Sequence, residues 1–123
     1  MKEESKFWQL VKRKTPQIQW TRLESWSSYG VPDLLGYNEN CGFFMVELKI
    51  QNGKKIHFSP HQRMFHLTRT NRNFILVHEP RTKTTMLYPS SAIHDLQLGV
   101  ARCLALDDWD HIQRLLLAAP CNA

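Results

Sequence analysis

The segment GVPDLLGYNENCGFFMVELKI (residues 30–50) consists of two apolar stretches on either side of the polar sequence NENCG. Short apolar runs separated by turn-forming residues are typical of a β-hairpin. Three charged residues interrupt this pattern: Asp33 in the first stretch, and Glu47 and Lys49 in the second. Because charged side chains are costly to bury in a sheet, their presence in these strands indicates a specific role.

The register of the hairpin decides whether these charges come together. If Tyr37 pairs with Phe43, then Asp33 lies opposite Glu47. Side chains alternate between the two faces of a strand, so Lys49 shares the face of Glu47. A slip of one residue would instead place the two acids on opposite faces. The hypothesis is therefore a single patch that contains all three charges in this register.

Periodicity and turn residues predict further elements on both sides of the hairpin. We expect helices over residues 4–14, from 59 to about 70, and one or two over 91–118; strands are expected over 17–24, 73–79 and 84–89, the last at a sheet edge. This order predicts an α/β fold in which a mixed sheet is flanked by helices and followed by a C-terminal helix. We expect one domain over residues 1–123, with its core over about 4–90 and a C-terminal helical extension over 91–123.

The helix that begins near residue 59 carries clear start signals. Ser59 is expected to be the N-cap and Pro60 the first helical residue. The spacing from Ser59 to Gln62 is that of a capping box, in which Gln62 reaches back to the Ser59 amide. The apolar residues Met64 and Phe65 are expected to face the core.

The distribution of charge favours a phosphate-rich partner. The chain has a formal net charge of +5, and between Lys49 and Lys83 eight Lys and Arg residues stand against one acid, Glu79. A basic region of this kind binds nucleic acid by neutralising phosphates and releasing counterions. The alternative is an ordinary solvated surface.

The remaining composition favours a soluble cytoplasmic protein. No apolar run approaches the roughly 20 residues of a membrane helix, and the N-terminal sequence lacks the apolar centre of a secretory signal. We therefore expect no membrane association. Three cysteines without paired spacing indicate a reducing compartment, no disulfide framework and no structural zinc site.

Asp33, Glu47 and Lys49 suit metal-assisted phosphodiester hydrolysis. Two carboxylates that face each other are destabilising unless a cation compensates them, and Mg²⁺ prefers oxygen ligands. A neighbouring lysine can stabilise charge on a phosphate or position an attacking water. The alternative is that Glu47 and Lys49 are solvated on a half-exposed strand and that Asp33 caps a turn.

The same residues resemble the signature of the PD-(D/E)XK nuclease superfamily. Pro32-Asp33 matches the P-D, Glu47-Leu48-Lys49 matches the E-x-K, and GKKIHFSPHQRMF (residues 53–65) resembles the "G…SP-x-Q" segment of the VRR-NUC branch. The resemblance covers about residues 4–80 and also extends to small stand-alone nucleases of phages. It implies a restriction-endonuclease-like αβββαβ core.

The resemblance also implies roles for individual residues. Asp33 and Glu47 would bind Mg²⁺ or Mn²⁺ together with the Leu48 carbonyl, Lys49 would be the catalytic lysine, and Gln62 would support the site from the next helix. The capping-box role of Gln62 is an equal alternative, and one residue could fill both roles.

An additional acid is usual in this superfamily, and three residues are candidates here. Glu24 follows the first strand and leads into the loop before Asp33, so it is preferred as a further catalytic residue and metal ligand. Glu4 is the second choice, and Glu3 the third. Glu3 and Glu4 could instead simply favour the N-terminus of the first helix.

Several residues are candidates for contact with DNA. The predicted phosphate-binding residues are Lys54, Lys55, Arg63, Arg69, Arg72, Ser27 and Ser28. Their alternative is a solvated face. Trp20 and Trp26 could stack on bases, but core packing is preferred. The histidines at 57, 61 and 66 are interpreted as surface residues or phosphate contacts rather than metal ligands.

Together these features predict a metal-dependent DNA endonuclease, phage-encoded and acting in the host cytoplasm. By family analogy it would be a homodimer that cleaves branched DNA, as Holliday-junction resolvases do. The alternatives are a general or nicking nuclease of the same superfamily, or a non-catalytic nucleic-acid-binding module.

Overall fold

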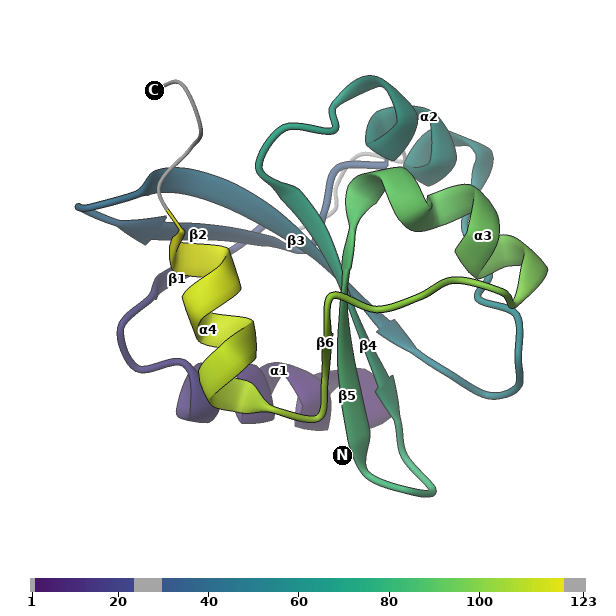
Figure 1. Cartoon of the computed structure of the whole chain (residues 1–123), viewed down its shortest axis with the longest axis horizontal. Coiled ribbons are helices and arrows are strands. Elements are labelled where there is room, and N and C mark those ends of the chain that lie inside the picture. Colours follow the sequence, from purple (N-terminus) through teal and green to yellow (C-terminus); the bar gives the residue numbers. More distant parts are fainter. Residues whose placement is uncertain (1, 24–29, 119–123) are drawn as a thin grey trace.

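The computed structural model describes residues 2–23 and 30–118 (Figure 1). In chain order the elements are α1 (Glu3–Lys14), β1 (Gln19–Arg22), β2 (Leu34–Asn38), β3 (Gly42–Ile50), α2 (Pro60–Thr68), β4 (Asn73–Glu79), β5 (Thr84–Pro89), a 3₁₀ turn (Ser90–Ala92), α3 (Ile93–Leu98), β6 (Ala105–Leu106) and α4 (Trp109–Leu117).

The six strands form one mixed sheet in the order β1-β2-β3-β4-β5-β6. Neighbouring strands are antiparallel except for β3 and β4, which are parallel and are connected through α2. The apolar residues of α1 and α4 share one core cluster, whereas those of α3 belong to a second cluster that lies with α2 across the sheet (Figure 1). The predicted α/β fold, with helices on both faces and a helix at the C-terminus, is confirmed.

The predicted hairpin register is confirmed. Tyr37 pairs with Phe43, and the antiparallel ladder between β2 and β3 ends where Leu34 pairs with Val46. Beyond that point β3 continues along β4 as far as Ile50. β2 and β3 therefore separate just before Glu47, and a space opens beside the central strand.

The C-terminal part of the chain contains a strand as well as the predicted helices. It contains the short strand β6, which pairs with β5, so β5 is not the edge strand that the sequence predicted. In α4, Ile112 and Leu116 are fully buried and pack in the same cluster as α1. The helix completes the core because its apolar stripe covers a sheet face that α1 alone leaves open.

The inward face of α2 is polar, contrary to expectation. Met64 is 60% exposed, whereas His66, interpreted as a surface residue, is fully buried. Gln62 and His66 are four residues apart, so they lie on the same side of the helix, one turn from each other. The helix turns this side toward β3 and leaves Met64 facing outward.

Trp20 packs in the core, as preferred. Its ring lies at 5.6 Å from the ring of Phe44 and 6.4 Å from that of Trp8, in edge-to-face arrangements, and its Nε1–H donates to Thr15 Oγ1 at 2.8 Å. Trp26 lies outside the described residues. Cys41 and Cys103 are free thiols. In residues 2–23 and 30–118, no helix has the length and apolar character needed to cross a membrane.

Candidate active site

A small hollow opens where β2 separates from β3. It is lined by Glu4 and Trp8 of α1, Arg22 of β1, Asp33 and Leu34, Glu47, Leu48 and Lys49 of β3, and Gln62 of α2, and it has a volume of about 120 Å³. A site needs roughly 10–15 Å³ of this kind of volume per water molecule, so the hollow has room for an ion with several waters. The predicted triad of Asp33, Glu47 and Lys49 therefore lines one site.

Asp33 immediately precedes β2, and its side chain accepts a hydrogen bond from β3 beyond the end of the β2–β3 ladder. Its Oδ2 accepts a hydrogen bond from the Leu48 N–H at 2.9 Å, and its own carbonyl accepts from the Leu23 N–H at 2.8 Å. Burial, together with the charge of Glu47, raises the pKa of Asp33 to about 7. The carboxyl group is thus held by a hydrogen bond in a place where its negative charge is disfavoured. A nearby cation would favour the charged form.

Glu47 is the most deeply buried acid of the site, with 2% of its surface exposed. Burial raises its pKa, an effect that the Lys49 charge opposes. Its Oε2 accepts a long hydrogen bond of 3.5 Å from Gln62 Nε2, while its Oε1 faces His66 Nε2 at 3.7 Å. Among the described residues Oε1 has no hydrogen-bond partner.

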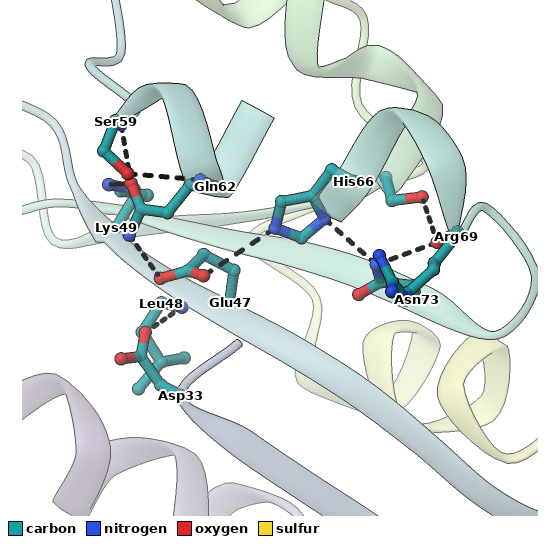
Figure 2. A network of polar contacts seen from close by, with 10 residues as sticks. Asp33, Glu47, Leu48, Lys49, Ser59, Gln62, His66, Arg69 and Asn73 are labelled. Carbon is teal, nitrogen blue, oxygen red and sulfur yellow. Dashed lines mark hydrogen bonds and ion pairs between the residues drawn. The ribbon is translucent and has the colours of Figure 1, made fainter. Parts of the chain in front are cut away.

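Gln62 forms the predicted capping box and also contacts Lys49 and Glu47. Its Oε1 accepts from the Ser59 N–H at 2.9 Å, and its backbone N–H donates to Ser59 Oγ at 3.1 Å, which completes the capping box. The same Oε1 accepts from Lys49 Nζ at 3.0 Å (Figure 2). Since both partners of Oε1 are donors, the amide nitrogen must point to Glu47. The helix start thereby orients two of the three charged groups.

Lys49 is held away from a direct ion pair with the acids. Its ammonium lies over the Phe58 ring, 4.7 Å from the ring centre, in addition to its bond to Gln62. No salt bridge joins it to Asp33 or Glu47 in the part of the chain that the structure describes. The positive charge is therefore available at the wall of the hollow.

His66 and Asn73 are site residues that the sequence did not indicate. One ring nitrogen of His66 faces Glu47, and the other contacts Asn73, at the start of β4 (Figure 2). The one available signal was the spacing of Gln62 and His66 on one side of a helix. It was missed because apolar residues are usually buried and polar ones exposed, whereas here His66 is buried and Met64 is exposed.

The candidate acids Glu3 and Glu4 lie at different hollows. Glu4 lies on α1 and lines the hollow, and its charge contributes to the raised pKa of Glu47. Glu3 lies instead on a different hollow, beside Lys6 and Phe7. Glu24, the preferred candidate, falls outside the described residues, as do Ser27 and Ser28.

The residues present fit a divalent cation, which they would not hold alone. Glu47 is buried and Asp33 is partly buried, both have raised pKa values, and Oε1 of Glu47 has no hydrogen-bond partner among the described residues. Such carboxylates are donors that Mg²⁺ or Mn²⁺ prefers. Within residues 2–23 and 30–118, no three His, Cys, Asp or Glu side chains come close enough to form a metal site by themselves. Asp33 and Glu47 would need further oxygens from backbone, water or substrate; Leu48 lines the hollow and is the nearest backbone candidate.

Some of the predicted DNA-contacting residues are exposed, and others contact side chains of the protein itself. Lys54 and Lys55 are exposed after β3. Arg69 is exposed and lies over the Phe65 ring at 4.5 Å, and Arg63 bonds to Gln97 of α3.

Arg72, another predicted DNA contact, is held by backbone carbonyls of its own chain. Its guanidinium donates to the carbonyls of Phe43, Ala118 and Leu116 at 3.1, 2.9 and 3.2 Å. These bonds anchor the end of α4 to β3.

Gly30 positions the loop that leads to Asp33. It has a φ of +77°, and a Cβ at this position would lie 2.2 Å from the carbonyl carbon of His61, in the first turn of α2. We expect Gly30→Ala to lower the free energy of unfolding by more than about 2 kcal/mol, since backbone strain and a backbone clash add. Urea unfolding followed by circular dichroism measures this change.

Gly42→Ala is the matched control for this prediction. Gly42 has a similar φ of +79°, but a Cβ there would meet nothing within 4 Å. Its replacement therefore reports the strain alone. If Gly30→Ala costs no more than Gly42→Ala, the close approach of the loop to α2 contributes nothing to stability.

Comparison with protein-family models, with curated proteins and with solved structures finds no match for this chain.

Proposed function

We propose that this protein is a metal-dependent DNA endonuclease. The observation that carries the proposal is the convergence of Asp33, Glu47 and Lys49 on one small hollow, where Glu47 is buried, Asp33 is partly buried and the pKa values of both are raised. A structural role for these charges would favour a salt bridge between Lys49 and one of the acids. Lys49 is instead held by Gln62, and within residues 2–23 and 30–118 neither acid forms a salt bridge with a lysine or arginine.

The proposed chemistry assigns a task to each side chain. Asp33 and Glu47 would hold Mg²⁺, with Glu4 near enough to the hollow to contribute. When bound, Mg²⁺ supplies stabilisation of phosphate charge and lowers the pKa of coordinated water. The Lys49 ammonium would stabilise the negative charge that develops on the phosphate as water adds and the ester oxygen leaves. Gln62 keeps Lys49 and Glu47 in place through both ends of its amide.

The substrate would be DNA, whose phosphates suit the exposed basic residues of this chain. Exposed Lys54, Lys55 and Arg69 can bind phosphates, and such contacts position a strand without reading its sequence. Selectivity for branched DNA and action as a homodimer rest on the resemblance to PD-(D/E)XK nucleases. A two-fold dimer would suit paired cuts in a four-way junction.

The test is cleavage of labelled four-way junction, flap, duplex and single-stranded DNA with Mg²⁺, with Mn²⁺ and with EDTA. We expect metal-dependent cleavage, with paired symmetric cuts in the junction. Equal cleavage of linear duplex would contradict the branch preference and leave a general nuclease.

Metal binding provides an independent check of the same proposal. Calorimetry should detect binding of Mn²⁺ to the wild type and its loss in Asp33→Ala. Glu39→Ala, which changes an exposed acid in the turn between β2 and β3, is the control and should bind normally. A wild type that binds DNA but no metal would instead indicate a non-catalytic binding module.

A further inference from the structure

A line of polar contacts runs from the C-terminal end of α2 to Glu47 (Figure 2). Asn73 Nδ2 lies 2.9 Å from the carbonyl oxygen of Arg69 and 3.1 Å from Nδ1 of His66. A carbonyl oxygen can only accept, so the Asn73 atom that faces it must be the amide nitrogen. This nitrogen carries a second hydrogen, which is directed to His66.

The Asn73 contact determines the tautomer of His66. Nδ1 accepts from the amide and therefore carries no proton, which leaves the proton of the neutral ring on Nε2. Burial, together with the charge of Lys49, lowers the pKa of His66 to about 4, so the ring is neutral at neutral pH. The Nε2–H is the atom that faces Glu47 Oε1.

We propose that His66 is a positioning residue, which donates its Nε2–H to Glu47 Oε1 and so orients this carboxylate toward a divalent cation. The role rests on the proposed nuclease function. Gln62 binds the other oxygen of Glu47 from the same side of α2. Both oxygens would then be oriented by one helix, and each would keep a lone pair for the cation.

The distance between His66 Nε2 and Glu47 Oε1 leaves room for this hydrogen bond to shorten. At 3.7 Å it exceeds a normal hydrogen bond, yet both atoms are buried and neither has another hydrogen-bond partner among the described residues. Contacts of catalytic groups are often long in the free protein and shorten when substrate binds. A small movement of Glu47 would satisfy both atoms.

The competing explanation is that His66 only fills space. Its ring packs edge-to-face against Phe58 and Phe65, with ring centres 6.2 and 6.1 Å away. A phenylalanine would serve equally well if packing were its whole role. The two explanations therefore differ in what they predict for a ring without nitrogen.

Three substitutions separate these explanations. His66→Gln places an amide nitrogen near the position of Nε2, His66→Asn reaches only the position of Nδ1, and His66→Phe retains an aromatic ring. We expect His66→Gln to bind Mn²⁺ nearly as well as the wild type. His66→Asn and His66→Phe should lose about 10- to 100-fold in Mn²⁺ affinity, the range typical of residues that orient a ligand.

The measurements are calorimetric Mn²⁺ affinity and single-turnover DNA cleavage, with urea unfolding to exclude global loss of structure. Met64→Gln, at an exposed position on the same helix, is the control and should be unchanged. Equal Mn²⁺ affinity in His66→Asn and His66→Gln would overturn the proposal. If His66→Phe does not fold, the comparison of His66→Asn with His66→Gln still distinguishes the two explanations.

The tautomer can be observed directly in the wild type. A long-range ¹⁵N–¹H correlation spectrum of the metal-free protein should show His66 protonated at Nε2, and protonation at Nδ1 would overturn the proposal. Failure of the wild type to bind Mn²⁺ or to cleave DNA would count against the proposed function instead. The two failures are therefore distinguishable.

Discussion

Replacing Lys49 by alanine is expected to lower the single-turnover rate of DNA cleavage by at least about a hundredfold, the effect of removing one preorganised charge-stabilising group. DNA affinity should change little, because it depends on many phosphate contacts of which Lys49 would supply at most one. The fold should persist, since Gln62 keeps its bonds to Ser59. Quenched-flow cleavage at saturating enzyme and filter binding measure the two quantities.

Lys54→Ala is the matched control for this experiment. Lys54 is exposed and lies five positions after Lys49 in the sequence. We expect its loss to weaken DNA binding and to reduce the salt dependence of that binding, with the cleavage rate at saturation unchanged. If Lys49→Ala instead lowers affinity and leaves the saturated rate intact, Lys49 binds phosphate and has no catalytic role.

Replacing Asp33 by asparagine is expected to stabilise the metal-free protein while abolishing metal binding. Because the pKa of Asp33 rises from 3.8 to about 7 on folding, the folded state binds the proton more tightly than the unfolded state. The folded protein therefore loses stability as the pH rises from about 4 to above about 7. The pKa difference corresponds to at most about 4 kcal/mol, and asparagine removes this cost.

The measurement is urea unfolding in EDTA at about pH 5 and about pH 8, on either side of the pKa of Asp33. The wild type should be the less stable of the two proteins at the higher pH, and the difference should shrink at the lower pH. Adding Mn²⁺ should stabilise the wild type alone. Glu39→Gln, at an exposed acid, should follow the wild type. An Asp33→Asn variant that is less stable at about pH 8 would mean that the carboxylate serves the fold.

Local sequence patterns predicted the parts of the site that are close in the chain. The alternation of side chains and the length of the turn placed Asp33 across from Glu47, and the observed ladder has that register. The Ser59 and Gln62 spacing predicted a capping box that the structure contains. Both depend on interactions within a few residues or across one turn, where backbone geometry leaves few alternatives.

The same patterns failed where the deciding contacts are long-range. The pairing of β6 with β5 and the anchoring of α4 by Arg72 depend on segments that meet only in the folded chain. Apolar spacing on α2 predicted an inward Met64 because apolar burial is the general rule. It could not show that the space facing this helix is occupied by a buried carboxylate.

The sequence by itself determined that Asp33, Glu47 and Lys49 could share one face, because strand alternation is a property of the chain. Only the tertiary structure decided that Gln62 and His66 turn toward them. Because β3 and β4 are parallel, the connection through α2 crosses one face of the sheet. Asn73, at the start of β4, therefore contacts His66. A buried carboxylate requires hydrogen-bond donors, and the folded arrangement of α2 over β3 determines which residues supply them.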